Sequence, residues 1–506
     1  MTRWRASPGV VYLALALVFV CAYLALSALG GPLGFPLDDA WIHQTYARNL
    51  GQRFEFAFVP GQPSAGSTSP LWTALLAVGY ALRVDYRVWT YGLGALLLAL
   101  NGWLAHRLVA RLWPNHSAAA WAAGVLVVAE WHLIWSGASG METVAFSAAA
   151  LLVFALEARF PLWLGVAGGL ALFLRPDGLS LLPFVLWRAA VRPLDSGSSP
   201  QAATIGQSLA AFGRSVSLKG GLQALAGFGL LLAAYLLFNL TVGGTPWPNT
   251  LYAKQAEYAI LRELPLTARL VQVSVPPLAG PAVLLLPGIG LCCLAFLRTP
   301  GRWEPVLPLA WAAGLIVVYA LRLPVTYQHG RYLIPVIPVL MASGVGGLWP
   351  RLQLGGPRPL GRILSRVWLA SVGVAAAAFW LVGAQAYARE VRIIDTEVVA
   401  AARWVAAHTE PDALIAAHDI GALGYFAGRP LVDMAGLISP EVIPIIRDEA
   451  RLGQWLSKQG ADYVMSFPGW YPRLLNPGAA EILYSTGAPH SPSLGGENMA
   501  VYRWLG

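Results

Sequence analysis

Two adjacent carboxylates, Asp38 and Asp39, follow a long apolar run near the start of the chain, in the stretch GFPLDDAWIHQTYARNL. A carboxylate can accept the proton of a hydroxyl group, so either acid has the chemistry of a general base. Successive residues of a helix point about 100° apart, so one acid can face a pocket while the other caps or orients the helix. A structural interpretation stays open, in which the pair only caps a helix that lies on the membrane with Trp41 and Tyr46 on its apolar face.

Other polar residues stand at the ends of apolar runs, and several are of the types that hold phosphate. Lysine and arginine bind phosphate oxygens through charge-assisted hydrogen bonds. The stretches SGMET, RPDG, TPWPNTLYAKQ and YQHGRYLIP supply the candidates, which are Glu142, Arg175, Asp177, Tyr252, Lys254, His329 and Arg331. Each residue alone could be a turn residue or an interfacial anchor. Taken together, they predict an anion site near the acid pair.

The metal dependence of this chemistry stays open. His43 lies four residues after Asp39 and shares its helix face, so the two could contribute to a site for a divalent metal ion. A lone histidine at an interface is more often a simple polar contact. The three cysteines, Cys21, Cys292 and Cys293, lie inside apolar runs and have neither metal-site nor redox spacing. No other cofactor is indicated.

The composition is that of a membrane protein. Hydrophobic residues make up 57% of the 506 residues and charged residues only 12%, against about a quarter charged in a soluble domain. A helix over residues 10–29 would be about 30 Å long, which matches the hydrocarbon thickness of a bilayer. This run is longer than the core of a signal peptide, so we expect it to remain as a membrane span.

Ten further apolar runs follow, which gives about eleven transmembrane helices in an all-α polytopic membrane protein. With the first, the runs cover residues 10–29, 88–105, 118–135, 143–156, 162–174, 179–191, 221–240, 278–297, 306–321, 332–348 and 367–386. The run at 71–82 is too short to cross and predicts an interfacial or re-entrant helix. Several others are short, so the number of spans is uncertain by about two.

The distribution of positive charge predicts the orientation. If the N-terminus is cytoplasmic, lysines and arginines far outnumber acids in the inside loops and are nearly balanced by acids in the outside loops. This orientation places Asp38, Asp39 and the anion-site candidates outside. The Ser-, Gly- and Gln-rich segment 196–220 then becomes a cytoplasmic linker. The net charge of +9 forms no basic stripe, so we expect no nucleic-acid partner.

The composition changes after residue 387, where charged residues become frequent. We therefore divide the chain into a transmembrane domain, residues 1–387, whose first external loop spans 30–87, and a small α/β domain, residues 388–506. EVVAAARWVAAH has helical spacing, whereas ALIAAHD, PLVDMAG, ADYVMSF and MAVYRWL are typical of strands. With eleven spans, this C-terminal domain is extracytoplasmic.

The polar stretches resemble a known family. DDAWIHQTYARNL, PGQPSAGSTSPLWTALLA, SGMET, RPDG, PWPNTLYAK and RYLIPVIPVL resemble, in this order, motifs of bacterial polytopic glycosyltransferases of the C superfamily. The likeness is greatest to arabinofuranosyltransferase-like and protein mannosyltransferase-like members and covers about residues 10–387. HDIGALGYFAGRPLVDMAGL resembles the external C-terminal domain that many of these proteins carry.

The resemblance implies a function and roles for the candidates. In that family an acid of the first external loop is the catalytic base and the donor is a sugar on polyprenyl phosphate. Asp38, the first acid of the pair, is then the expected base; the role of Asp39 stays open, because the family often has Asp-Glu here. Lys254 and Arg331 become expected ligands of the donor phosphate. Further donor-binding candidates are Glu142, Arg175, Tyr252 and His329.

These implications amount to an inner-membrane glycosyltransferase whose active site faces outside. It would transfer a sugar, with inversion, to a cell-envelope glycan, lipid or protein. A transporter or flippase of lipid-linked sugars and a non-catalytic membrane scaffold are the alternatives. Transporters tend to have duplicated halves and charges at the midplane of the membrane. Here the polar stretches lie at one face and no duplication is visible, so the sequence favours the enzyme.

Overall fold

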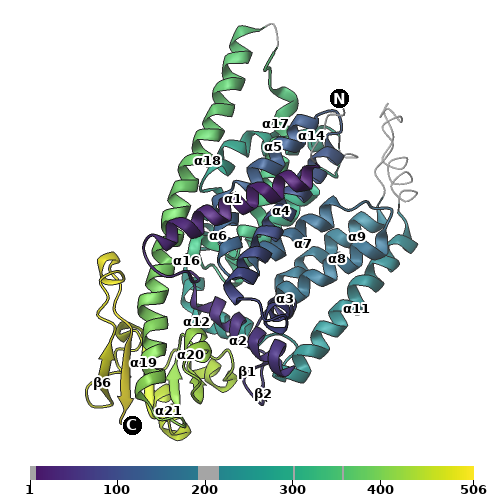
Figure 1. The fold of residues 1–506 in the computed structure, drawn as a ribbon. Helices are drawn as coiled ribbons and strands as arrows, with labels where there is room; N and C mark the ends of the chain where they lie inside the picture. The colour runs from purple at the N-terminus through teal and green to yellow at the C-terminus, as the bar shows by residue number, and fades with distance from the viewer. Residues whose placement is uncertain (1–6, 192–215, 300–302, 356–357) are drawn as a thin grey trace.

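The computed structural model describes residues 7–191, 216–299, 303–355 and 358–506. Most of the chain forms a bundle of helices, and a small mixed α/β part packs at one end of it (Figure 1). Residues 196–215 of the predicted linker 196–220 lie outside the described residues. The architecture is therefore the predicted one, a polytopic helical membrane domain with a small C-terminal α/β domain.

All eleven predicted apolar runs are helical. The helices of the bundle are α1 (Pro8–Ala28), α4 (Tyr86–Leu112), α5 (Ser117–Val128), α6 (Trp131–Ala138), α7 (Thr143–Ala155), α8 (Pro161–Leu174), α9 (Leu182–Ala190), α11 (Leu218–Gly243), α14 (Leu286–Arg298), α15 (Leu307–Arg322), α17 (Ile337–Leu348) and α18 (Pro359–Ile394). Short 3-10 segments, among them η1 (Pro176–Leu181), η4 (Pro281–Leu285) and η5 (Ile334–Val336), extend some of them.

The segments between these helices carry most of the polar candidates. They form α2 (Asp38–Arg53), β1 (Ala57–Val59), β2 (Gln62–Pro63), α3 (Pro70–Ala81), α12 (Asn249–Glu257), α13 (Leu266–Ser274) and α16 (Tyr327–Gly330). The first external loop is therefore largely folded: α3 packs on α2, and the side chain of Trp72 in α3 is fully buried.

Fewer helices than eleven are long enough to cross a bilayer alone. Within the described residues six helices have the length and apolar composition of a span, or seven if α5 and α6, bent by 50°, count as one. α3, α7, α8 and α15 are shorter apolar helices. Prolines and glycines break the remaining runs, as RPDG does where α8 ends and η1 begins. Such breaks are tolerated in a membrane where neighbouring helices cover them.

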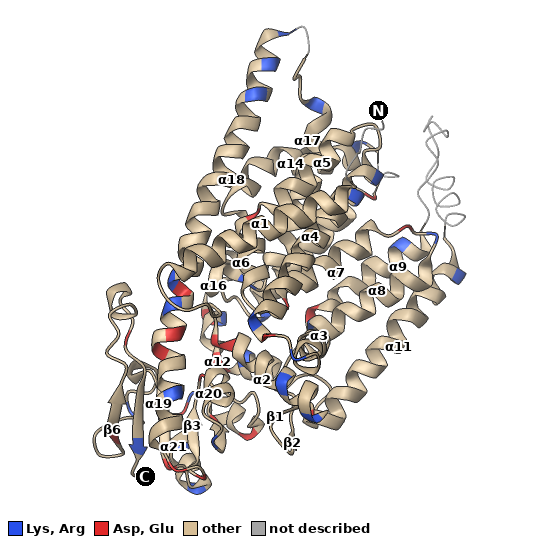
Figure 2. Ribbon diagram, in the orientation of Figure 1, with Lys and Arg blue, Asp and Glu red and all other residues tan. Residues whose placement is uncertain are grey.

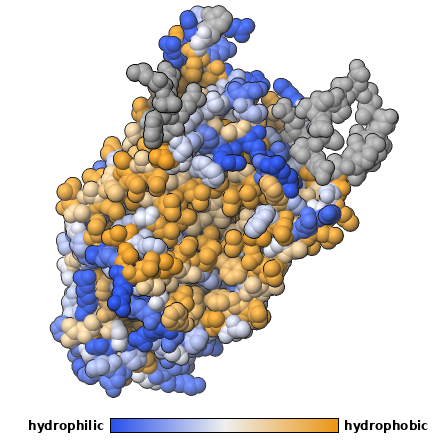
Figure 3. All heavy atoms as spheres, turned by 45° about the vertical axis from the view of Figure 1, so that its right-hand side comes forward, coloured by the Kyte–Doolittle hydropathy of each residue, from blue (hydrophilic) through white to orange (hydrophobic). Residues whose placement is uncertain are grey.

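The outer surface of the bundle is apolar. In the most apolar stretches of α1, α11 and α18 only 22%, 22% and 17% of the residues are buried. Figure 3 shows a broad hydrophobic surface across the middle of one face, with hydrophilic residues toward its two ends. Exposed apolar side chains on this scale require a lipid environment, so the protein is a multi-pass membrane protein.

The predicted outside segments gather at one end of the bundle. α2, α12 and the C-terminal sheet lie at this end, whereas α1 and α18 begin at the other (Figure 1). Charged residues are concentrated toward the two ends, and most acids lie toward the end that carries the C-terminal domain (Figure 2). The candidates for chemistry therefore share one end of the molecule.

The C-terminal domain continues directly from the last membrane helix. α18 passes through a π-helical segment (Asp395–Val399) into α19 (Ala400–His408), so the helix crosses the predicted boundary at residue 387 without a break. The strands are β3 (Ile415–Ala417), β4 (Leu431–Asp433), β5 (Tyr463–Ser466), β6 (Ala480–Ser485) and β7 (Ala500–Trp504). They form one sheet in the order β4-β3-β5-β7-β6, with α20 (Gly421–Phe426) and α21 (Glu449–Gln459) between strands.

The sheet of the C-terminal domain is mixed. β3 pairs in parallel with both β4 and β5, and β7 pairs antiparallel with β5 and β6. Parallel strands need a crossover between them, which the segments with α20 and α21 supply. The carboxyl end of β3, followed by His418 and Asp419, is thereby positioned beside the bundle.

Helix α2 lies between the bundle and the C-terminal domain, and its residues from Ala40 to Ala47 are buried. The ring of Trp41 packs on Tyr425 and Phe426 of α20, with centroid distances of 5.0 and 4.8 Å. Arg48 donates a hydrogen bond of 2.8 Å to the carbonyl oxygen of Tyr425. The apolar face of α2 thus packs inside the protein, not on the membrane surface.

Reporter insertions should establish the orientation. α18 connects Leu354 to the C-terminal domain, and the charge bias puts Leu354 inside. A reporter active only outside the cytoplasm should therefore be active when fused after Gly506 and inactive when inserted after Leu354. The reverse pattern would place the whole polar end in the cytoplasm.

Candidate active site at the junction of two cavities

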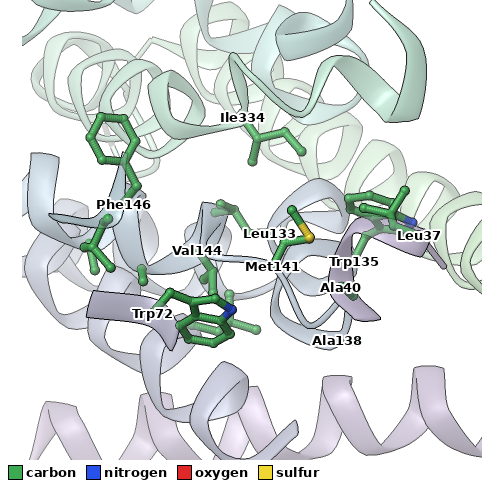
Figure 4. Packing of buried hydrophobic residues seen from close by; sticks show 14 of the residues in the cluster. Leu37, Ala40, Trp72, Leu133, Trp135, Ala138, Met141, Val144, Phe146 and Ile334 are labelled. Carbon is green, nitrogen blue, oxygen red and sulfur yellow. The ribbon is translucent and has the colours of Figure 1, made fainter. Parts of the chain in front are cut away.

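The turn between α6 and α7 holds the start of α2 in place. Gly140 in this turn has a φ of 77°, and a β-carbon there would lie 2.9 Å from the ring of Phe35 and 3.1 Å from Ala40. The indole of Trp72 donates a hydrogen bond of 2.9 Å to the carbonyl oxygen of Gly140. Leu37 and Ala40, at the start of α2, lie close to Trp135 and Ala138 of α6 (Figure 4). This packing brings the acid pair next to the turn.

Asp38 is buried and bonds to the C-terminal domain. Its carboxylate accepts hydrogen bonds from the backbone N–H groups of Gly421 (2.7 Å) and Ala422 (2.8 Å), at the start of α20. Burial raises the pKa of Asp38 well above its usual range, and the negative charge of Asp419 adds to this shift. The residue before α2 is Leu37, which makes no side-chain cap. Asp38 therefore joins two parts of the protein and does not cap its own helix.

Asp39 points away from Asp38, toward the bundle. Its carboxylate forms an ion pair of 2.5 Å with the guanidinium of Arg331, and its side chain remains 29% exposed because it faces open space. Burial alone would raise the pKa of Asp39, but the positive charges of Arg331 and Lys254 outweigh it and hold the pKa at about 2. Asp39 is therefore ionised across the physiological pH range.

Two cavities meet at Asp39. The helix cavity lies among α2, the α6–α7 turn, η1, α12 and α15, and its empty space is about 770 Å³ when the part open to solvent is counted. The interdomain cavity lies between α12, the segment at α16 and the C-terminal domain, and its empty space, counted in the same way, is about 1680 Å³. Asp39, Lys254 and Arg331 line both cavities. A carboxylate and two cations therefore stand where two binding spaces join.

The ion pairs around the helix cavity form a connected series. Glu142 pairs with His43 (3.3 Å) and with Arg175 (3.7 Å), and Arg175 pairs with Asp177 (2.7 Å). The hydroxyl of Tyr319 donates a 2.6 Å hydrogen bond to Asp177. The RPDG stretch thus begins the 3-10 helix η1, where its composition suggested a turn, and supplies two charged side chains to the cavity.

Arg331 keeps one hydrogen-bond donor group unused. Its Nη2 contacts Asp39 and the hydroxyl of Tyr332 (3.3 Å), whereas the buried Nη1 has no hydrogen-bond partner within the described parts of the chain. Arg331 itself is 5% exposed. The two residues before Gly330, Gln328 and His329, adopt the left-handed conformation, with φ values of 53° and 60°. A buried unpartnered guanidinium N–H beside a cavity favours an anionic ligand.

The C-terminal domain contributes to the interdomain cavity. The ammonium of Lys254 lies 3.2 Å from Glu257, and Glu257 lies 3.5 Å from His418. The pKa of Glu257 is about 2, because Lys254 and the hydrogen bond with His418 outweigh the effect of burial. The neighbouring Asp419 also lines this cavity, and burial together with nearby carboxylates raises its pKa to about 6.

The structure brings together most of the predicted site residues. Asp39, Glu142, Arg175, Lys254 and Arg331 line the helix cavity. Asp38 lines only the interdomain cavity. Sequence analysis assigned no role to Glu257, His418 and Asp419; the adjacent His and Asp directly after a buried strand were the available signal.

Two predicted donor-binding residues lie elsewhere. Tyr252 is 37% exposed and lines neither cavity. His329 pairs with Glu390 of α18 at 2.9 Å, and its ring lies between Trp131 and Trp135, with centroid distances of 5.0 and 5.2 Å. Their assignment to donor binding stays a prediction, and the geometry gives it no support.

The carboxylates of the site do not form a metal centre. Among the described residues no group of three or more His, Cys, Asp or Glu side chains is arranged to hold a metal ion. Asp39 is paired with Arg331, and Glu142 is paired with His43 and Arg175. Asp39 and His43, which were expected to share a metal site, therefore have separate partners in this structure, and the metal dependence stays a prediction. Arg331 and Lys254 supply positive charge at the junction themselves.

Comparisons with known proteins match the C-terminal residues to a family model and nearly the whole chain to solved structures. Residues 385–502 match the family model of a domain of unknown function (DUF8728). No curated protein matches the chain by sequence. The solved structure of ArnT from Cupriavidus metallidurans bound to undecaprenyl phosphate is similar, with 16% identity, 97% of each chain covered and a TM-score of 0.57.

A second solved structure agrees. The oligosaccharyltransferase of Archaeoglobus fulgidus in the apo form has 12% identity and a TM-score of 0.57, over 93% of this chain and 73% of that one. At such low identity these likenesses show the fold alone. The chain has the GT-C-type fold, that of the polytopic C-superfamily glycosyltransferases, as the sequence motifs predicted.

The contact of Asp38 with α20 can be tested by substitution. Asp38→Ala leaves two buried N–H groups without an acceptor. It should weaken the free energy of docking between the C-terminal domain and α2 by about 2 kcal/mol. The midpoint of thermal unfolding should fall and proteolysis of the C-terminal domain should become faster. Asp38→Asn keeps an acceptor oxygen and should have a smaller effect, as should the exposed control Asp412→Asn. Unchanged unfolding of Asp38→Ala would show that this contact does not hold the domain.

Proposed function

We propose that this protein is a membrane glycosyltransferase that transfers a sugar from a polyprenyl-phosphate donor to an extracytoplasmic acceptor. The supporting observation is the junction of two cavities at Asp39, Lys254 and Arg331, with an unused guanidinium N–H at that point. A transferase of this kind needs two substrate spaces that meet at one base and one anion site. The GT-C-type fold supports the same assignment, and ArnT was solved with undecaprenyl phosphate bound.

The donor phosphate would be bound by Arg331 and Lys254. Its sugar would occupy the helix cavity, which is lined largely by α2, by α12 and by segments between the bundle helices, among them Arg175. The polyprenyl chain would stay in the bilayer, since its transfer to water is unfavourable. As the bond to the sugar breaks, negative charge grows on the phosphate, and one well-placed donor can stabilise it by about 3 kcal/mol.

The base in this proposal is Asp39, where the sequence led us to expect Asp38. The oxygens of Asp38 accept hydrogen bonds from the backbone of α20, and its side chain does not reach the helix cavity. Asp39 lines both cavities and its carboxylate is ionised. Asp39 is therefore placed where a general base could reach both substrates, and Asp38 is placed where it links α2 to α20.

The low pKa of Asp39 makes it a weak base while the donor site is empty. Arg331 is the main charge that lowers this pKa, and a bound phosphate would share the guanidinium. The basicity of Asp39 would then rise when the donor is present. Proton transfer can also lag behind bond formation, so that the acceptor hydroxyl is already acidic when it loses its proton.

The reaction balances with these groups alone. The acceptor hydroxyl oxygen forms a bond to the anomeric carbon, and its proton passes to Asp39. The bond between the anomeric carbon and the phosphate oxygen breaks, and polyprenyl phosphate leaves with the electron pair. A single displacement inverts the anomeric centre. We further propose the inner membrane as its location, with the site facing outside.

Loss of a phosphate ligand should weaken donor binding. Arg331→Lys keeps the charge but loses the fork of N–H groups, and Lys254→Gln loses the charge. Each variant should raise the dissociation constant of a polyprenyl-phosphate sugar at least about tenfold, as one lost charge-assisted hydrogen bond predicts, without loss of folded protein. Arg262→Ala, at an exposed arginine on the same end, is the control. If both variants bind the donor as tightly as the wild type, Arg331 and Lys254 only form structural ion pairs and do not bind the donor.

Replacement of the base should abolish most turnover. Asp39→Asn keeps the shape of the side chain but cannot accept the proton, so kcat should fall by about a hundredfold or more. Donor binding should be retained or become tighter, because the carboxylate of Asp39 no longer competes for Arg331, and Asp38→Asn should retain much more activity. If Asp38→Asn loses more turnover than Asp39→Asn, Asp38 is the base. Near-normal turnover of both variants would contradict any catalytic role for the pair.

A further inference from the structure

One wall of the interdomain cavity is aromatic and comes from the C-terminal domain. Phe467, Trp470 and Tyr471 line it, and Trp470 is 47% exposed. The ring of Trp470 packs against His418 and Phe467, with centroid distances of 4.9 and 5.1 Å. Half-exposed indole surface inside a cavity is available to a ligand with an apolar face.

The segment that presents Trp470 is held firmly. Trp470 ends the 3-10 helix η9 (Pro468–Trp470), and the backbone N–H of Gly469 donates a hydrogen bond to the carboxylate of Glu497. The hydroxyl of Tyr471 forms a 2.7 Å hydrogen bond with Nδ1 of His418. The aromatic surface is therefore preorganised, which lowers the cost of binding a ligand on it.

The rest of the cavity is acidic. Apart from the three residues that it shares with the helix cavity, its charged lining consists of Asp38, Glu257, Asp419, Glu449 and Arg447. Glu257 is paired with Lys254 and His418, and Glu449 accepts hydrogen bonds from the backbone of Arg473 and Leu474. Asp419 is different, because its carboxylate accepts no hydrogen bond within the described part of the chain.

This combination of surfaces suits a carbohydrate. A sugar ring has a face of C–H groups that packs on an aromatic ring, and hydroxyls at its edge that donate to carboxylates, which can only accept. A second phosphate group would be repelled by the excess of acids, and a hydrocarbon chain would leave Asp419 without a partner. The chemistry of the lining therefore separates this cavity from the donor site.

We infer that the interdomain cavity binds a carbohydrate acceptor, with Trp470 under the sugar ring and Asp419 accepting from its hydroxyls. A sugar in this position can present another hydroxyl to Asp39 at the junction of the cavities. The C-terminal domain lies beyond the ends of the bundle helices (Figure 1), so an acceptor enters from the aqueous side. The acceptor role rests on the proposed function, whereas the carbohydrate site stands on its own geometry.

Binding can be measured without turnover. The full-length protein, in a detergent without a sugar head group, is titrated with methyl glycosides of mannose, glucose and arabinofuranose and followed by saturation-transfer NMR. At least one glycoside should show saturation of ring C–H protons. Trp470→Ala and Asp419→Asn should weaken its binding at least about tenfold, in line with loss of one stacked ring or one charge-assisted hydrogen bond. Ile482→Ala and Asp412→Asn, exposed positions of the same domain, are matched controls.

The outcomes distinguish this inference from the proposed function. Absence of glycoside binding, or equal binding by wild type and Trp470→Ala, overturns the inference. Transfer from a polyprenyl-phosphate sugar to a hydroxyl-bearing peptide or lipid, insensitive to Trp470→Ala, also overturns it and leaves the proposed function intact. Specific glycoside binding without any transfer or donor hydrolysis supports the carbohydrate site and contradicts the transferase. In the expected result, Trp470→Ala loses transfer to the glycoside and retains hydrolysis of the donor.

Discussion

The ion pair between Asp39 and Arg331 joins segments that lie 292 residues apart in the sequence. Burying a guanidinium without an opposite charge or enough hydrogen-bond acceptors beside it costs several kcal/mol in a low-dielectric interior. Asp39 supplies that charge to Arg331, and the left-handed residues before Gly330 bring the arginine to it. The pair therefore determines how the start of α2 faces the last third of the bundle, and the two cavities form around it.

The first turn of α2 serves both parts of the protein. Asp38 accepts from the backbone of α20, and a side chain at Gly421 would collide with the carbonyl oxygen of Asp38, so only glycine permits this contact. The next residue, Asp39, faces the cavities. Because one peptide bond separates the two carboxylates, docking of the C-terminal domain and the position of the proposed base depend on the same turn. A helix that only rested on the membrane could not provide this coupling.

The two cavities that meet at Asp39 differ in the charge of their walls. On the side of the helix cavity the acids Glu142 and Asp177 are both paired with Arg175, so the cations at the junction remain available to an anion. On the side of the C-terminal domain acids are in excess and Trp470 is exposed. A charged phosphate and an uncharged polyhydroxylated molecule would therefore favour different sides of Asp39, as a transfer between two such substrates requires.

The sequence by itself determined where the apolar helices lie. A membrane-spanning segment must be apolar along its length, and this property can be seen in consecutive residues without knowledge of the fold. It also indicated the segments that face one end, through the charge of the short loops, and four of the five strands of the C-terminal sheet. The strand of this sheet that it missed, β6, lies at the edge, where its side chains are largely exposed and the apolar pattern is weak. The short pair β1 and β2 was not predicted either.

Tertiary packing decided the rest. Adjacent acids look alike in a sequence, and only the approach of α20 on one side and Arg331 on the other distinguishes Asp38 from Asp39. Tyr252 and His329 stand in the same short stretches as Lys254 and Arg331, yet they point to the surface and to Glu390. Asp419 enters the cavity from the C-terminal domain, which follows all the predicted site residues in the sequence. Each of these outcomes depends on contacts between distant segments, and spacing along the chain carries no information about the direction in which such segments approach.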